Sequence, residues 1–494
     1  MSDQMLMILA LLIPTVAAFI IPVVGKVPNL REAVSFIAGA ALLAVVVLLI
    51  QRVGAGERPE LYLGEFAGRF EIKFVLEPLG AMFAAIASSL WIVNSLFTLG
   101  YMRGNNEVKQ TRFFTCVAIA IAAAMGIALS GNLITLFIFY EVLTISTFPL
   151  VTHKGDAAAR KGGTVYALIL MGTSLGLLFP AIIGTQIIAG STDFVVGGVF
   201  GPEVSMTAVG ILLFLFAYGI GKAALMPIHP WLPNAMVAPT PVSALLHAVA
   251  VVKAGVFTML KVVVYTFGPD LTYASGASTV LAWIAAASIV IASLIALRQD
   301  NLKKRLAYST VSQLSYVTLG AMLAAPAALL GAGLQIVMHA WGKITLFMCA
   351  GAIYTVAHRS NVSSFDGLGR SMPWVFGAFL IGAFSIIGIP PMGGSWAKFY
   401  LILGSLESSK ALIIAALIVS SILNVLYLIP VAGRAFLLPA PDETADAAIK
   451  AGRRQHWAVI LPPVVTAAGA CVLFFFAGDI AEFLTPMLPT AGVN

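Results

Sequence analysis

Apolar runs recur along the chain at nearly regular intervals. They lie near residues 5 to 24, 33 to 51, 75 to 100, 112 to 130, 131 to 151, 164 to 189, 206 to 226, 240 to 265, 277 to 298, 306 to 325, 328 to 357, 373 to 406, 411 to 435 and 457 to 478. Most approach or exceed the ~20 residues that an α-helix needs to cross a bilayer. The pattern predicts an all-α integral membrane protein of about fourteen transmembrane helices, with residues 1–494 forming a single membrane domain.

Two of these runs contain turn-forming residues at membrane depth. One interruption extends from Gly219 to Pro233 in the seventh run, and the other from Gly388 to Lys398 in the twelfth. Irregular backbone inside a bilayer is tolerated only where protein or a water-filled cavity satisfies its hydrogen bonds. We therefore predict that helices 7 and 12 are broken.

The spacing of the two breaks predicts an internal repeat. A pair of breaks in corresponding positions is typical of transporters built from inverted repeats, and these breaks are five spans apart. Because an odd number of spans reverses the orientation, repeats of five spans must be inverted. We predict a first inverted repeat in spans 4 to 8, residues 112–265, and a second in spans 9 to 13, residues 277–435.

Composition supports a membrane protein and gives its expected orientation. The chain is 60% hydrophobic and 10% charged, with a mean hydropathy of +0.99, whereas soluble domains are about 25% charged. The net charge of +7 would suggest nucleic acid in a soluble protein, but basic loops also orient membrane proteins. With both termini outside, roughly 18 of the 28 Lys and Arg lie in cytoplasmic loops. We expect this topology and no nucleic-acid partner.

A few charges interrupt the apolar runs. Glu141 alone among the 21 acidic residues sits deep in such a run. An ionisable group at mid-helix costs roughly 2.5 to 3.5 kcal/mol on insertion scales and is usually functional or paired, so a salt bridge that packs two helices is the structural alternative. Lys261 lies near its helix end, where its side chain is expected to snorkel to the interface. Five lysines fall within the runs: Lys222, Lys253, Lys261, Lys343 and Lys398.

Two histidines accompany these lysines. His339 and Lys343 are four residues apart and share one helix face. His247 and Lys253 are six residues apart, about 120° in helical angle, and are expected to point at different neighbours. A membrane histidine is either a packing residue or part of a proton relay, and the nearby lysines favour the relay.

Buried lysines of this kind suit proton transfer. Burial disfavours the charged amine, and a nearby carboxylate stabilises it. At an effective dielectric constant near 20, unit charges about 6 Å apart interact by roughly 3 kcal/mol, enough to load or unload a proton. The segment Gly219-Ile-Gly-Lys222 lacks the first glycine and the Ser or Thr of a phosphate loop. No Cys or His cluster has metal-ligand spacing, so we expect neither a cofactor nor a metal.

Several motifs carry a family resemblance. The most specific begins at His229-Pro-Trp-Leu-Pro, continues to His247 and runs on to Lys253. Supporting stretches are Phe139-Tyr-Glu141-Val, Asp300-Asn-Leu-Lys-Lys-Arg and His339-Ala-Trp-Gly-Lys343. Over nearly its whole length the chain resembles the antiporter-like subunits shared by Mrp-type cation/proton antiporters, respiratory complex I and membrane-bound hydrogenases.

The resemblance implies roles for the buried charges as a proton relay. Glu141 matches the fifth-helix glutamate and Lys222 the seventh-helix lysine with which it pairs, while Lys253 matches the central relay. Lys398 matches the terminal lysine of the broken twelfth helix, where some relatives carry glutamate. The connecting positions on the eighth and eleventh helices are His247, His339 and Lys343.

Within that family the chain looks most like the MrpD component of the Mrp antiporters, because it ends soon after its fourteenth span and has lysine at 398. The resemblance implies a proton-translocating subunit of a multisubunit Na⁺/proton antiporter. Such a chain is a secondary transporter rather than an enzyme, with other hydrophobic subunits as partners in the bacterial cytoplasmic (inner) membrane. The alternative is a proton-pumping subunit of a redox-driven complex, either NADH:quinone oxidoreductase or a hydrogenase. A solute permease would need a polar pocket at the breaks, where the chain has mostly Ala, Gly and Leu.

Overall fold

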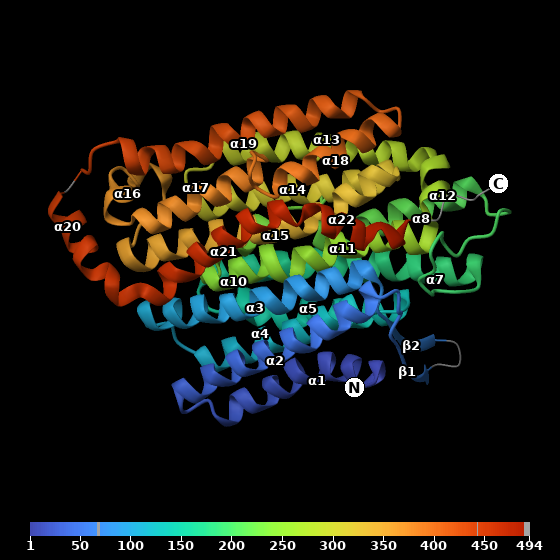
Figure 1. The fold of residues 1–494 in the computed structure, drawn as a ribbon, viewed down its shortest axis with the longest axis horizontal. Coiled ribbons are helices and arrows are strands. Elements are labelled where there is room, and N and C mark those ends of the chain that lie inside the picture. The colour runs from blue at the N-terminus through green and yellow to red at the C-terminus, as the bar shows by residue number, and fades with distance from the viewer. Residues whose placement is uncertain (67–69, 442, 489–494) are drawn as a thin grey trace.

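The computed structural model describes residues 1–66, 70–441 and 443–488. Most of its helices run along one direction, horizontal in Figure 1. Within the described residues, eleven helical segments are long and apolar enough to cross a membrane. They are α1 (Asp3–Val23), α2 (Pro28–Gly54), α3 (Pro78–Gly104), α4 (Gln110–Ala128), α5 (Leu133–Val151), α6 with α7 (Ala157–Thr173 and Phe179–Ala189), α10 with α11 (Thr240–Ala244 and Val251–Val262), α13 (Gly276–Leu297), α15 (Pro326–Ala357), α19 (Leu412–Leu437) and α21 (Trp457–Phe475).

Three further spans are shorter or more polar. The tenth span is α14 (Leu302–Leu323), which begins with a basic cluster and is buried among other helices from Leu306 onward. The seventh begins with α8 (Met206–Gly219), and the twelfth consists of α17 (Pro373–Ile387) and α18 (Gly394–Glu407). Together with the eleven, these make fourteen spans in the described part of the chain, and helices 7 and 12 are broken as predicted. The inverted relation between spans 4–8 and 9–13 stays a prediction.

The two ends of the bundle carry different short elements. At one end, β1 (Glu60–Phe66) and β2 (Phe70–Val75) form an antiparallel hairpin, which the sequence analysis did not anticipate, near α12 (Pro269–Ala274). We call this the hairpin end. The opposite end, with α16 (Leu368–Ser371) and α20 (Glu443–Gly452), is the basic end (Figure 1). The remaining short helices are α9 (Trp231–Asn234) and α22 (Ala477–Leu484).

Local chemistry explains several helix starts. Proline occupies the first turn of α2, α3, α15 and α17, where its missing N–H costs nothing. The side chain of Asn132 accepts a hydrogen bond from the Thr135 N–H at 2.7 Å, and Asp156 does the same for Ala159. Such N-caps satisfy backbone donors that the helix itself leaves free.

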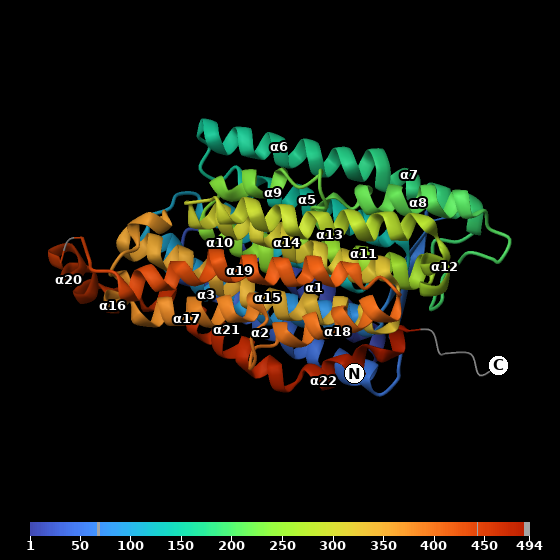
Figure 2. The ribbon, with the colours of Figure 1, turned by 90° about the horizontal axis from the view of Figure 1, so that it is seen from above.

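Spans 8 and 11 form the centre of the bundle. The whole apolar window of Thr240–Phe267 is buried, as is 94% of that of α15, against 33% for the peripheral α6–α7 segment. Figure 2 shows α6 along one edge of the molecule. Polar groups on spans 8 and 11 therefore face protein rather than lipid.

Glycine allows the broken seventh span to touch the central eighth. A Cβ atom on Gly255 of α11 would collide with the backbone of Lys222 and Ala223. The break is therefore held against span 8 by direct backbone contact, and a larger residue would push it away.

We expect Gly255→Ala to destabilise the protein by about 1–3 kcal/mol, because the packed backbone must move to admit the methyl group. The apparent melting temperature in detergent measures the change. Gly172→Ala is the matched control, since a Cβ at Gly172 meets nothing within 4 Å. Equal melting temperatures for the two variants would contradict the close packing of this break.

Candidate functional site

Lys222 lies in the break of the seventh span. After α8 the chain makes a single 3₁₀ turn, Gly221–Ala223, and Ala224 adopts a left-handed conformation with φ of 53°. Two side chains bond to the backbone freed by the break. The Lys222 N–H donates to the Tyr140 hydroxyl at 3.1 Å, and the Trp231 indole N–H donates to the Gly221 carbonyl at 3.0 Å. The irregular backbone is thus satisfied by protein, as a membrane requires.

The Lys222 ammonium group is held by α5. It donates to the Tyr140 carbonyl at 2.8 Å and to Thr144 Oγ1 at 2.6 Å, and it lies 3.1 Å from the centroid of the Tyr140 ring. Tyr140 and Thr144 are one helical turn apart and present a single face to the lysine. The sequence analysis assigned no role to either residue.

Glu141 is a neighbour of Lys222 without contacting it. The two groups are close enough to interact electrostatically, but no ion pair within 4.0 Å joins them. Both carboxylate oxygens of Glu141 are buried and have no hydrogen-bond partner among the described residues. Glu141 is turned by about 100° from Tyr140 around the helix. No direct contact joins the two residues in the described part of the chain, and the pairing that the family resemblance implied stays a prediction.

Spans 8 and 11 meet through a lysine and a histidine. Lys253 Nζ lies 2.7 Å from Nδ1 of His339, and the other ring nitrogen, Nε2, is buried without a partner among the described residues. His339 and Lys343 both lie on the continuous helix α15, so the prediction that they share one face is confirmed. The contact connects the two halves of the chain that we predict to be repeats.

His247 and Lys253 contact different residues, as predicted, although both of those residues lie on α15. His247 packs its ring on Phe347 of α15, with centroids 4.5 Å apart, so both residues face α15. His247 lies in a π-helical turn, Leu245–Val249, and Ala250 interrupts the helix before α11 begins. A π turn holds more residues than an α-helical turn, so the α-helical angle does not apply across it.

A polar chain continues from Lys343. Its ammonium donates to Ser309 Oγ of α14 at 2.8 Å, and the Tyr427 hydroxyl of α19 is hydrogen-bonded to the same oxygen at 2.8 Å. The Tyr427 hydroxyl also contacts Asn424. Three spans are therefore linked by neutral polar side chains that the sequence analysis did not identify.

Lys398 closes the break of the twelfth span. Its ammonium donates to the carbonyl of Ile387, the last residue of α17, at 2.7 Å, and to Ser421 Oγ of α19 at 2.8 Å. Helix C-termini leave carbonyl groups without intrahelical partners, and here the lysine supplies one. Ser421 and Asn424 are about one turn apart on α19, but no hydrogen bond among the described residues joins them.

The expectation that Lys261 snorkels to an interface is wrong. Its side chain is fully buried and forms an ion pair with Glu77 Oε1 at 2.6 Å, while it donates to the Ser130 carbonyl at 2.7 Å. Glu77 caps α3 by accepting the Gly80 N–H. Its place directly before Pro78 and an apolar run was the available sequence signal for this buried cap.

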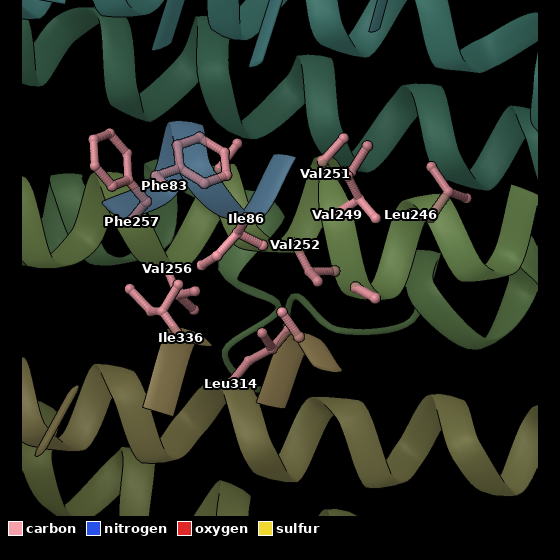
Figure 3. Close-up of a cluster of buried hydrophobic side chains, with 14 of the residues drawn as sticks. Phe83, Ile86, Leu246, Val249, Val251, Val252, Val256, Phe257, Leu314 and Ile336 are labelled. Atoms are coloured by element: carbon pink, nitrogen blue, oxygen red, sulfur yellow. The ribbon is translucent and has the colours of Figure 1, made fainter. Parts of the chain in front are cut away.

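Apolar side chains surround the central lysines. Figure 3 shows residues of spans 3, 8, 10 and 11 packed around span 8, among them Phe83, Val252, Phe257, Leu314 and Ile336. A cation in such surroundings loses its hydration, so each ammonium depends on its few polar partners. Among the described residues, no group of three or more His, Cys, Asp or Glu is placed to hold a metal ion.

The family model described as "NADH:quinone oxidoreductase/Mrp antiporter, TM" matches residues 130–424. This is more than half of the chain, and it includes the candidate glutamate, lysines and histidines. The chain belongs to this family. The resemblance to the antiporter-like subunits is thereby confirmed, and the protein is an antiporter-like, multi-pass membrane subunit of the Mrp and complex I family.

Relatives and solved structures agree with the assignment. NADH-quinone oxidoreductase subunit N of Desulforudis audaxviator (strain MP104C) is 30% identical over 470 residues, covering 92% of each chain. NAD(P)H-quinone oxidoreductase subunit 5 of the Paulinella chromatophora chromatophore is 32% identical, but the match covers 76% of this chain and only 58% of that longer one.

The fold is shared with subunits of two solved membrane complexes. A chain of the Mrp complex from Dietzia sp. DQ12-45-1b superposes with a TM-score of 0.83 at 22% identity, covering 99% of this chain and 97% of that one. A chain of the membrane-bound sulfane sulfur reductase, an archaeal respiratory membrane complex, gives 0.80 at 20% identity and covers 99% and 100%. At such identities the likeness shows the fold.

We expect Tyr140→Phe to cost about 1–3 kcal/mol of stability, because the Lys222 N–H would be left buried without an acceptor. Thermal unfolding of the purified protein checks this value. Tyr273→Phe, at an exposed position, should leave the melting temperature unchanged. A melting temperature for Tyr140→Phe equal to that of the control would show that the hydroxyl does not stabilise the break.

Proposed function

We propose that this chain is the proton-translocating subunit of a multisubunit monovalent cation/proton antiporter, with Na⁺ as the exchanged cation. One observation carries the proposal. The ammonium groups of four fully or largely buried lysines bond to neutral partners, and none has a carboxylate within 4.0 Å among the described residues: Lys222, Lys253, Lys343 and Lys398. A buried amine without a counter-ion changes its protonation when a neighbouring charge moves.

Glu141 supplies a movable charge at one end of the lysine row, which consists of Lys222, Lys253, Lys343 and Lys398. Its carboxylate has no hydrogen bond to break among the described residues. A shift of the carboxylate toward Lys222 would stabilise the ammonium, and a shift away would favour release of its proton. At an effective dielectric constant near 20, such a change is worth roughly 3 kcal/mol at about 6 Å.

Proton transfer at the centre of the lysine row needs little motion of the side chains. A proton can pass from Lys253 Nζ to His339 Nδ1 across 2.7 Å. The imidazolium can then release the proton on Nε2, and Lys343 lies one turn further along α15. Because each ring nitrogen is distinct, the imidazole can receive a proton on one side and release it on the other. His247, against Phe347, lies on the basic-end side of Lys253 along span 8 and is a candidate for proton supply to Lys253.

From Lys343 the polar chain offers a continuation to the twelfth span. Hydroxyl groups accept one proton and donate another, so Ser309 and Tyr427 can connect Lys343 to α19. Ser421 carries the contact to Lys398. The proposed route therefore includes Glu141, Lys222, Lys253, His339, Lys343 and Lys398, with His247 at the side.

The antiporter assignment rests on fold and on residue 398. The Mrp chain covers 99% of this chain at a TM-score of 0.83, and Lys398 keeps the terminal position basic. We propose hydrophobic partner subunits and a place in the bacterial inner membrane with the basic end in the cytoplasm.

A redox-driven role is the second candidate, favoured by the relative of 30% identity named NADH-quinone oxidoreductase subunit N, which the match covers over 92% of its length. The same relay would then pump protons within an enzyme complex. The two candidates differ in energy source rather than in proton chemistry.

Replacing Lys222 or Glu141 with Ala in the assembled complex should reduce proton flux at least about tenfold, since a positioned proton-transfer group contributes 10²–10⁴ in rate. A pH-sensitive dye inside vesicles reads the flux. Lys109→Ala and Glu203→Ala are matched controls, because both side chains are exposed. Wild-type flux in Lys222→Ala or Glu141→Ala, with the complex assembled, would remove these residues from the relay.

The coupling partner is tested by reconstituting the complex with Na⁺, K⁺ or Li⁺ on one side and the dye on the other. Antiport predicts a pH change driven by a Na⁺ gradient without any electron donor. If protons move only when NADH and a quinone, or another redox pair, are supplied, the antiporter assignment is wrong and the redox-driven candidate is favoured.

A further inference from the structure

The proposed relay does not use the ion pair between Lys261 and Glu77. We propose that this pair is a proton-exchange site that connects Lys253 with water at the hairpin end, so that the lysine row has a branch along span 8. The inference rests on the proposed proton-transfer function and adds a second titratable pair to it.

Lys261 lies on the same helix as the central lysine. Lys253 and Lys261 lie eight residues apart on α11, which corresponds to about 12 Å along a helix axis. Thr258 lies between them along the helix, about 140° around the axis from Lys253 and about 60° from Lys261, and its buried hydroxyl has no hydrogen-bond partner among the described residues. Threonine in a helix often donates a hydrogen bond to the carbonyl one turn earlier. Thr258 makes no such bond among the described residues, so its hydroxyl can bond a bridging water.

The partners of Lys261 come from elements at the hairpin end. Ser130 lies between α4 and α5, and Phe194, whose ring centroid is 4.6 Å from the ammonium, lies in the loop after α7. Glu77 is on the outer side of the pair, with 9% of its side chain exposed, whereas Lys261 has none. A second, partly exposed ion pair lies at the hairpin end, where Lys73 Nζ is 3.2 Å from Asp193 Oδ2. Glu77 is thus the member of the pair with Lys261 whose side chain lies nearer to the surface.

A purely structural ion pair leaves some features unexplained. Tyr265, one turn after Lys261, has a buried hydroxyl without a partner among the described residues, and it is within electrostatic range of Glu77. The Thr266 hydroxyl is likewise buried and unbonded there. Buried polar groups are normally satisfied by protein or ordered water, so these hydroxyls indicate a route that water can follow.

The pair begins and ends the cycle with zero net charge. The Lys261 N–H bond breaks and an O–H bond forms on Glu77, which converts ammonium and carboxylate into amine and carboxylic acid. The acid then gives its proton to water at the hairpin end. The amine takes a proton that originates on Lys253 and arrives through water at Thr258, which restores the ion pair. One proton has crossed, and the cycle is reversible.

Variants of the assembled complex in proteoliposomes test the branch. Glu77→Gln keeps the hydrogen bond to the Gly80 N–H but cannot carry the proton. We expect Glu77→Gln and Lys261→Gln to lower the dye-reported flux at least about tenfold. The double variant should regain thermal stability, because it leaves no unpaired buried charge, yet its flux should stay low. If the ion pair only stabilises the fold and carries no proton, the double variant should regain both thermal stability and proton flux. That result would overturn the proposal.

Thr258→Val is an independent test that leaves the ion pair intact. It should assemble normally and lose at least about fivefold in flux, because a proton route through this position loses its hydroxyl. Unchanged flux in Thr258→Val would overturn the route between the two lysines. Lys222→Ala, measured in parallel, distinguishes failure of the branch from failure of the proposed function. If Lys222→Ala keeps wild-type flux, the proposed function fails. If it is inactive while the double variant is fully active, only the branch fails.

Discussion

A charge or a free backbone group inside apolar protein is costly unless it has a hydrogen-bond partner. In this molecule the buried lysines and the broken helices supply such partners to each other. A broken helix leaves carbonyl and N–H groups unbonded, and a buried lysine leaves an ammonium without water. Lys398 bonds the carbonyl that ends α17. Lys222 has its own N–H on the Tyr140 hydroxyl and its ammonium on the Tyr140 carbonyl. Break and lysine thus stabilise one another.

The partners of each lysine decide how readily its charge responds to the surroundings. Lys253 and Lys261 lie on the same helix and are equally buried, but one contacts an imidazole and the other a carboxylate. An ion pair in a low-dielectric interior holds its charge strongly, and removing one member leaves the other uncompensated. An amine beside a neutral base gives up its proton more easily. Span 8 therefore carries two different electrostatic settings within about two turns of helix.

The sequence was sufficient to predict features that a single residue reveals, such as a charge within an apolar run. Lys222, Lys343 and Lys398 stand out because a charge in an apolar run is visible without knowledge of its contacts, and glycine with proline likewise marks the breaks. The partners could not be predicted in this way. Ser309 and Tyr427 are common residues whose importance comes from spans brought together by folding.

Local backbone accounts for the other differences. The direction of His247 depends on a π turn and on the interruption at Ala250, neither of which hydrophobic periodicity reveals. The buried pair of Glu77 and Lys261 was not predicted, because it depends on segments far apart in the sequence that folding brings together.

The position of Lys253 determines what the two proposed branches can do. Toward α15 it faces His339 and then Lys343, and toward the hairpin end it faces a pair whose net charge is zero. A protonated Lys343 repels a further proton on the His339 side, while the neutral pair of Glu77 and Lys261 does not. Charge on Lys343 would therefore direct a proton from Lys253 along span 8, and a neutral Lys343 would let it continue across the bundle. In the proposed relay, a shift of about 3 kcal/mol would change the equilibrium between the branches by more than a hundredfold, so the protonation of one lysine would select the branch.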